Sequence, residues 1–263
     1  SASFEAMDFD DIEEVGFYYE GVRSGWAHGL EFDAFSVNAV NRASIGVRLN
    51  ARLQAVYNPS TGMMNTNLRQ NNLLPLTQPF NAAPWNYNGS ESVESSGDFP
   101  ANVVDWCLVE LRNANNSEQI LQQKAAWILA DGSVVDIEAK DDASVRGVIF
   151  EGMESSDTYF VSIKFRNHLA VLSANTISLS DSQTLDFTDP AQVLQGNSQL
   201  ADTGNGVYAC FAGDMDGNGV VNVEDFNRFS SEISQLNGYL SGDCNLDGAA
   251  TVTDYNWYSG NAS

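Results

Sequence analysis

Two acidic twelve-residue segments near the C-terminus carry the residues whose spacing could bind a metal ion. Each has side-chain oxygens at positions 1, 3, 5, 9 and 12, a glycine at position 6 and a backbone carbonyl at position 7, the arrangement that surrounds Ca²⁺ with oxygen ligands. The predicted ligands are Asp214, Asp216, Asn218, Val220, Asn222 and Asp225 in the first segment, and Asp243, Asn245, Asp247, Ala249, Thr251 and Asp254 in the second.

The alternative to a metal site is a pair of ordinary acidic turns, because Asp, Asn and Gly also dominate surface turns. Two copies in the same register favour calcium, and the three carboxylates of each copy suit a divalent cation better than an uncompensated cluster of like charges. Both copies end in Asp where the EF-hand pattern has Glu, so bidentate coordination at position 12 is less secure. We therefore predict two Ca²⁺ sites.

Helical patterns follow both segments. Apolar residues recur every three to four positions from Val223 to Leu236, which predicts a helix that ends at Asn237 and Gly238. A shorter helical stretch is expected after the second segment, from Val252 to Tyr258. A domain this small holds little core, so we expect calcium to supply much of its folding free energy.

The paired loops, each closed by Asp and followed by a helix-like stretch, resemble the dockerin modules of secreted bacterial proteins over about residues 210–260. This resemblance implies a small helical calcium module and a cohesin-like protein as a partner. Dockerins usually carry small hydroxyl or basic residues at loop positions 10 and 11. This chain departs from that pattern, with Val223 and Glu224 in the first loop and Val252 and Thr253 in the second.

Composition limits the classes of function. The chain has 263 residues, 43% of them apolar, enough for one large domain and one small domain. Its 35 acidic and 12 basic residues give a net charge of −23, which argues against binding to nucleic acid or to an anionic membrane, because both would repel it.

An extracellular location is expected from three features. No apolar run approaches the length of a membrane span, and no secretory apolar region is visible. The chain begins Ser-Ala-Ser, which fits a mature chain after signal-peptide removal, with an expression scar as the alternative. Loops with so few charged ligands suit millimolar external calcium rather than the cytosolic concentration.

The large domain has the alternation of β-strands. Apolar and polar residues alternate strictly over 45–55 and again over 159–166, and residues 103–111 are apolar on both faces apart from Asp105 and Glu110, as in a central strand. Asp131 and Gly132 predict a hairpin turn. Further strands are expected near 30–37, 124–130, 133–138, 145–150, 169–173, 176–180, 184–188 and 206–211. We predict a mainly β chain: an antiparallel, immunoglobulin-like β-sandwich over 21–206, and a small α-helical module over 207–263.

A long segment, 58–102, interrupts the strands. It contains five of the six prolines together with many apolar residues. A connection of this length packs on its own side chains or binds a ligand, and we favour packing over the sandwich. The amino-acid sequence at 73–80, 103–106, 129–132 and 165–169 resembles that of a β-rich module that precedes calcium repeats in large bacterial surface proteins.

The N-terminal residues 1–20 form a predicted arm or edge strand. Acidic residues alternate with apolar ones up to Glu14, and Val15, Phe17 and Tyr19 then share one face of a short strand. The strand either adds to an open sheet edge of a neighbouring subunit or completes its own sandwich. In the first case the chain would form a homo-oligomer or a filament.

Cysteines and glycosylation triplets give weaker signals. Cys210 precedes the first loop and Cys244 lies inside the second, so a disulfide between them is one hypothesis, whereas Cys107 reads as an inert buried thiol. The N-x-[ST] pattern occurs at Asn88, Asn115 and Asn261, which could carry sugar in a secreted chain.

No catalytic motif is present, and we predict that the chain is not an enzyme. His28 and His168 read as structural residues, and carboxylate pairs carry little weight in so acidic a chain. The leading hypothesis is an extracellular calcium-binding structural protein that assembles through its arm. The alternative is an adhesin, a carbohydrate-binding protein with a tryptophan platform, or a cohesin-docking subunit of a larger assembly. Trp106 and Trp127 have the setting of core residues in strands; the candidate platform residues are Trp26, Trp85, Trp106, Trp127 and Trp257.

Overall fold

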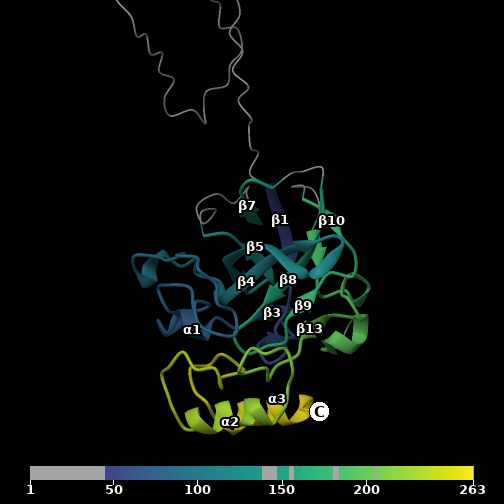
Figure 1. Ribbon diagram of the computed structural model, residues 1–263. Coiled ribbons are helices and arrows are strands. Elements are labelled where there is room, and N and C mark those ends of the chain that lie inside the picture. The colour runs from purple at the N-terminus through teal and green to yellow at the C-terminus, as the bar shows by residue number, and fades with distance from the viewer. Residues whose placement is uncertain (1–44, 138–146, 154–156, 180–183, 205, 263) are drawn as a thin grey trace, which may run out of the picture. The chain divides into compact units, whose positions relative to one another are not determined.

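The computed structural model describes residues 45–137, 147–153, 157–179, 184–204 and 206–262 (Figure 1). The predicted arm at 1–20, with Val15, Phe17 and Tyr19, therefore lies outside the described residues. The same holds for the strand expected at 30–37, for His28 and for Trp26.

Strands predominate in the described chain, and its helices are few and short. The strands are β1 (Ile45–Asn50), β2 (Tyr57–Asn58), β3 (Met63–Met64), β4 (Val103–Asn113), β5 (Asn116–Leu129), β6 (Ser133–Val135), β7 (Val148–Phe150), β8 (Thr158–Lys164), β9 (Val171–Leu172), β10 (Ile177–Ser178), β11 (Thr184–Asp186), β12 (Leu200–Asp202) and β13 (Tyr208–Cys210). The helices are α1 (Asn67–Gln70), α2 (Val223–Glu232) and α3 (Val252–Asn261), with three 3₁₀ turns, η1 (Ser96–Asp98), η2 (Pro190–Gln192) and η3 (Gly196–Gln199).

Within the described residues, the main sheet has nine strands in the order β10-β8-β4-β5-β6-β1-β11, with β7 also paired to β1 and β9 to β8. Among the described strand pairs, only β1 with β11 is parallel. Strands β6 and β7 pair with successive parts of β1, so two expected strands together line one stretch of its edge. The prediction of a mainly β chain with antiparallel sheets is confirmed, and this arrangement is consistent with a β-sandwich.

Strand β4 is an interior strand of this sheet, between β5 on one side and β8 on the other, and nearly all of its side chains are buried. Trp106 on β4 and Trp127 on β5 are cross-strand partners with ring centroids 5.6 Å apart, and Phe99 packs on the edge of both. Such aromatic contacts add to the free energy of burial. Trp106 and Trp127 are therefore core residues and cannot form a sugar-binding platform.

The 58–102 segment packs into the same core. Met64, Leu68, Leu74 and Phe80 are buried within the large hydrophobic cluster of the β domain. The side-chain amide of Gln78, itself buried, bridges the segment internally by donating to the carbonyl of Gly89. This burial matches a packed covering of the sheet better than a free ligand loop.

The observed strand β1 is shorter than the strand that the alternating pattern predicts over 45–55. Strand β1 ends at Asn50, although Ala51 and Leu53 remain buried. The reason is a change of partner, since the backbone of residues 52–54 exchanges hydrogen bonds with Cys210 at the end of β13. The apolar–polar alternation therefore predicts which side chains are buried, but it does not predict where the strand ends.

Helices α2 and α3 lie side by side (Figure 1), with Phe226 against Tyr255 at a centroid distance of 6.1 Å. A second hydrophobic cluster lies under them, built around Met215, Phe229, Cys244 and Tyr258. Two expectations are corrected here. Helix α2 ends at Glu232, before the expected stop, because Ile233 is extended and Ser234 has a positive φ. Helix α3 has ten residues, like α2, instead of forming a shorter stub.

The predicted disulfide between Cys210 and Cys244 is not formed. Both are free, buried thiols, as is Cys107. Cys210 belongs to the core of the β domain and Cys244 to the cluster under the helices, so each side chain faces a different set of apolar neighbours. Burial raises the pKa of Cys210 to about 12 and that of the other two thiols well above the ordinary value, which makes all three unreactive.

Within the described part of the chain, no helix has the length and apolar character needed to cross a membrane.

Candidate metal centre

The first loop brings three carboxylates together. Asp214, Asp216 and Asp225 each place an oxygen within 4.8 Å of the other two. They occupy positions 1, 3 and 12 of the loop predicted from sequence. In the described residues this is the only such acidic group, so the carboxylates of the second loop do not converge to the same degree.

Asp214 has the features that point most clearly to a cation site. Its side chain is buried, and its Oδ2 accepts a hydrogen bond from the backbone N–H of Gly219 at 3.1 Å. Its Oδ1 is buried without a partner. Burial raises the pKa of Asp214 to about 7, and the negative charge of Asp225 adds to the effect. A buried carboxylate oxygen with no donor is costly unless a cation compensates it.

Asp225 closes the loop onto the start of α2. Its Oδ1 accepts hydrogen bonds from the backbone N–H groups of Met215 and Asp216, and its Oδ2 accepts one from Asn222. Burial raises its pKa above the ordinary value. One aspartate therefore shapes the loop and also places a carboxylate beside Asp214.

The remaining predicted ligands of the first loop have other bonds. Asn222 caps α2, because its side-chain oxygen accepts a hydrogen bond from Glu224 N–H at 2.6 Å. Asn218 donates its amide to Asp216 and to Glu224, and its oxygen accepts from the N–H of Val220, which is half-exposed. Glu224 thus joins the loop's polar network, although the sequence pattern gives it no role.

The second loop repeats these bonds. Asp254 accepts hydrogen bonds from the backbone N–H groups of Asn245 and Thr251, and Thr251 caps α3 as Asn222 caps α2. The amide of Asn245 donates to Asp247, as Asn218 donates to Asp216 in the first loop. The N–H of Ala249, at position 7, donates to Asp247. The duplication seen in sequence is therefore also a duplication of local structure.

Asp243 differs from its counterpart Asp214. Both of its oxygens are satisfied, Oδ1 by the N–H of Asp247 at 3.0 Å and Oδ2 by the N–H of Gly248 at 2.8 Å. Burial raises its pKa to about 7, while the positive charge of Arg166 acts in the opposite direction. The second loop is thus partly compensated by protein groups alone.

Calcium fits the donor set of both loops. All the predicted ligands supply oxygen, which a hard cation such as Ca²⁺ prefers, and no histidine or cysteine side chain is among them. The unpartnered oxygen of Asp214 gives the first loop a specific place for a cation. When bound, such an ion would neutralise the clustered carboxylates and hold the loop on the helix that follows.

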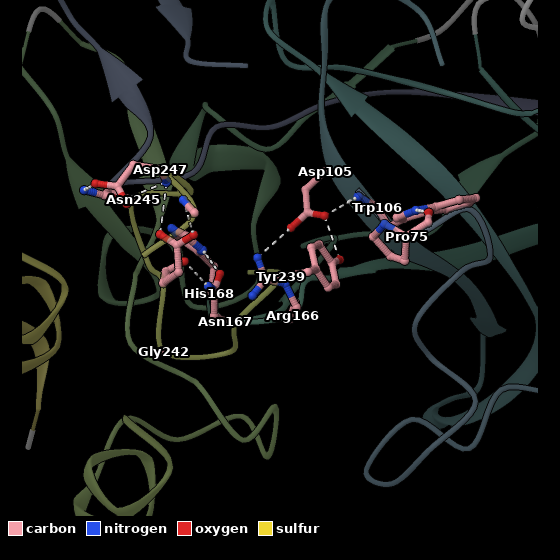
Figure 2. A network of polar contacts seen from close by, with 12 residues as sticks. Pro75, Asp105, Trp106, Arg166, Asn167, His168, Tyr239, Gly242, Asn245 and Asp247 are labelled. Carbon is pink, nitrogen blue, oxygen red and sulfur yellow. Dashed lines mark hydrogen bonds and ion pairs between the residues drawn. The ribbon is translucent and has the colours of Figure 1, made fainter. Parts of the chain in front are cut away.

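A buried polar network joins this region to the β domain, and sequence reasoning missed it. Figure 2 shows Arg166 and Tyr239 meeting at Asp105 of β4. Asp105 accepts a hydrogen bond from Tyr239 Oη at 2.7 Å and pairs with Arg166 Nη2 at 3.3 Å. The Arg166 guanidinium also lies 4.0 Å from the centroid of the Tyr239 ring. A tyrosine between the two loops thus anchors them to the central strand.

The charges of this network support one another. Burial alone would lower the pKa of Arg166, but the negative charges of Asp105 and Asp243 raise it above its ordinary value. For Asp105 burial raises the pKa, and Arg166 acts against it. A signal for this network was present in the sequence as Asp105, an acid inside an otherwise apolar strand.

The other predicted residues have individual outcomes. His168 is buried, with Nδ1 2.9 Å from the Asn167 side-chain oxygen, and burial together with Arg166 lowers its pKa to about 3. It is thus neutral at physiological pH and has a structural place. Asn88 and Asn115 are exposed, as glycosylation requires. The amide of Asn261, by contrast, donates to Gln54 and Ala212, so a sugar there would break both bonds.

Comparisons with known proteins give only distant likenesses. No protein-family model matches the sequence, and no curated protein matches it. Two crystal structures of type II cohesin–X-dockerin complexes from Acetivibrio cellulolyticus contain similar chains. In the complex with an N-terminal interface mutation, the likeness covers 60% of this chain and 80% of that chain, with 17% identity and a TM-score of 0.35. In the complex with a C-terminal interface mutation, it covers 83% and 96%, with 14% identity and a TM-score of 0.40.

Proposed function

We propose that this chain is a non-enzymatic, extracellular structural protein whose C-terminal loops bind two Ca²⁺ ions. The observation that carries the proposal is the buried, unpartnered Oδ1 of Asp214, inside a group of three converging carboxylates. The second loop repeats the same helix cap and the same closing aspartate. Two acidic turns with no ligand would give no reason to bury an unsatisfied carboxylate oxygen.

Calcium stabilises the fold in this proposal. An ion that binds only the folded loops raises the free energy of unfolding by RT ln(1 + [Ca²⁺]/Kd), about 2.7 kcal/mol when free calcium is a hundred times Kd. Extracellular calcium is high enough to fill sites with few charged ligands. The metal then acts on structure and takes part in no reaction.

The test is thermal unfolding of the whole chain in calcium and in a chelator. We expect calcium to raise the unfolding temperature of the wild type, and the double variant Asp214→Asn, Asp243→Asn to lose most of this shift. Glu118→Gln, an exposed acid on β5 outside the loops, is the charge-matched control and should keep the full shift. Equal unfolding temperatures of the wild type with and without calcium would refute the proposal.

Assembly through the N-terminal arm is a further part of the proposal. Val15, Phe17 and Tyr19 would add as a strand to the sheet edge of a neighbouring chain, with the strand completing its own sandwich as the alternative. Electron microscopy of the chain with calcium, before and after deletion of residues 1–20, tests it. Filaments that disappear on deletion while the monomer stays folded support exchange of the arm. A misfolded deletion variant would place the strand in its own core.

Docking to a cohesin-like protein is the second candidate function. Val223 and Val252 occupy the same position at the start of the two helices, and their exposed fractions are 66% and 68%. Phe226 and Tyr255 follow at matching positions, each 39% exposed. Paired apolar side chains on neighbouring helices are typical of a surface that binds another protein.

A binding experiment with purified cohesin separates this candidate from self-assembly. The double variant Val223→Asp, Val252→Asp should lose binding, while Leu121→Asp, at an exposed leucine of β5, should keep it. Absence of cohesin binding, combined with self-association that the same double variant abolishes, would assign the surface to a second copy of the chain.

A further inference from the structure

The second loop is bonded directly to the β domain. The side-chain amide of Asn167 donates to the Asp243 carbonyl at 2.6 Å, and that of Asn65 donates to the Asn245 carbonyl at 3.0 Å. Leu246, at loop position 4, is buried in the hydrophobic core of the β domain, and Leu73 packs against Gly248. The loop is thus fixed on both its polar and its apolar side.

The first loop has a weaker attachment. In the described part of the chain, no hydrogen bond joins residues 214–225 to the β domain. Its contacts are apolar: the side chains of Pro84 and Trp85 lie against Gly217, and Met215 and Val221 are buried in the cluster under the helices, against which Ala55 and Leu169 of the β domain pack. Van der Waals contact of this kind fixes a loop less firmly than hydrogen bonds combined with a buried leucine.

The charges around the two loops also differ, and again the second loop is the one that the rest of the protein stabilises. The charged neighbours of Asp214 are the carboxylates of Asp225 and Asp216, which repel it, and only backbone N–H groups of the loop act in the opposite direction. Asp243 faces the buried cation of Arg166, and both its oxygens accept backbone N–H groups. The first loop therefore needs an external cation for its carboxylates, and the second loop has part of that compensation built in.

We propose that the β domain holds the second loop folded with or without calcium, so that calcium controls the order of the first loop and α2 alone. This inference rests on the proposed calcium binding and assigns its structural effect to one of the two sites. Asn167 and Asn65 are positioning residues for the second loop in this account. The chain would then change the exposure of one helix, and not of its whole C-terminal part, when calcium is removed.

Amide hydrogen exchange of the whole chain, read by peptide in calcium and in a chelator, tests the inference. Peptides over 214–232 should exchange about a hundredfold faster in the chelator, relative to free calcium at a hundred times Kd. Peptides over 243–254 should keep their protection in both conditions. Loss of protection in both loops on chelation would overturn the inference and leave calcium binding intact. Absence of any calcium effect would refute the proposed function itself.

Two single substitutions should make the folded state of the second loop depend on calcium. Asn65→Ala removes the hydrogen bond to Asn245 at a partly exposed position, and Asn167→Ala removes the bond to Asp243 at a buried one. Each should make the protection of 243–254 calcium-dependent. Arg228→Gln, which breaks the surface ion pair with Glu232 and an exposed hydrogen bond to Ser241 outside the loop, is the control and should leave that region unchanged. Protection of 243–254 that persists in the chelator in both asparagine variants would overturn their positioning role.

Discussion

The two loops have the same ligand pattern and are attached to the molecule by different means. Position 4 makes the difference plain: it is Gly217 in the first loop and Leu246 in the second, both with positive φ. The glycine leaves room for Trp85, whereas the leucine extends its side chain into the core of the β domain. A non-glycine residue in the left-handed region is strained, and burial of the leucine offsets that strain. A repeated motif can therefore diverge in its anchoring while its ligand pattern is retained.

The two loops also differ in how protein groups compensate their first aspartate. Asp214 keeps a buried oxygen without a donor, while the oxygens of Asp243 are both hydrogen-bonded and Arg166 lies near. A cation would thus contribute more to the first loop than to the second. Four experiments test this difference between the two loops.

Leu246→Ala should have the largest effect. Truncation of a buried leucine costs about 2–5 kcal/mol, and alanine keeps the strain of the positive φ without the burial that offsets it. We expect the second loop to lose its protection from hydrogen exchange in a chelator. The matched control is Leu236→Ala, because Leu236 lies in the same region and is 66% exposed. Equal stability losses in chemical denaturation for the two variants would contradict a special anchoring role.

Asp214→Asn and Asp243→Asn should separate metal binding from loop structure. The first removes the charge beside the unpartnered oxygen, so calcium affinity at that site should fall on the order of a hundredfold while the second loop stays folded. The second places an amide donor against a backbone N–H donor, so it should loosen its own loop even without calcium. Calcium titration and hydrogen exchange of both variants check this. Equal calcium affinities and equal hydrogen-exchange protection in the two variants would show that the two loops do not differ in this way.

Calcium affinity should depend on pH near neutrality. The pKa values of Asp214 and Asp243 are raised in the folded state to about 7, so the metal-free fold is stabilised by these groups at acidic pH and loses that contribution as pH rises through about 7. Calcium requires the deprotonated carboxylates. Affinity at the first site should therefore increase about tenfold from about pH 6 to about pH 8. Titrations at both values should show this increase, and Asp214→Asn should reduce it.

Tyr239→Phe should have the smallest effect. It removes the hydrogen bond to Asp105 and keeps the ring under Arg166, so the expected cost is about 1–2 kcal/mol in chemical denaturation. Tyr255→Phe serves as the control, since it removes a hydroxyl from a partly exposed ring that packs against Phe226 and not against the β domain's polar network. A loss no larger than that of the control would show that the tyrosine hydroxyl contributes nothing to the anchoring.

The sequence predicted the class of fold and the positions of both loops because these follow from local patterns. Alternation over 159–166 and the apolar run at 103–111 indicated strands, and β8 and β4 are there. The end of β1 was not predictable, because it depends on a distant partner at Cys210. The early end of α2 was missed because the apolar spacing continues into extended backbone at Ile233.

The anchoring of the second loop depends on residues far apart in the chain, so spacing could not show it. Arg166, Tyr239 and Asp105 meet only after the β domain has folded. Leu246 gave a local signal, as an apolar residue in an acidic loop, but its pocket was not visible in sequence. The disulfide hypothesis was wrong for the same reason: Cys210 and Cys244 have different neighbours in the fold.

Calorimetric titration of the chelator-treated chain with calcium is the decisive measurement of metal binding at the first loop. We expect heat from calcium binding, with the heat of the first site absent in Asp214→Asn and retained in the control Glu118→Gln. Binding of calcium to the wild type that is unchanged in Asp214→Asn would place the ion elsewhere. No heat of binding at any accessible temperature, together with no calcium effect on unfolding, would contradict the account.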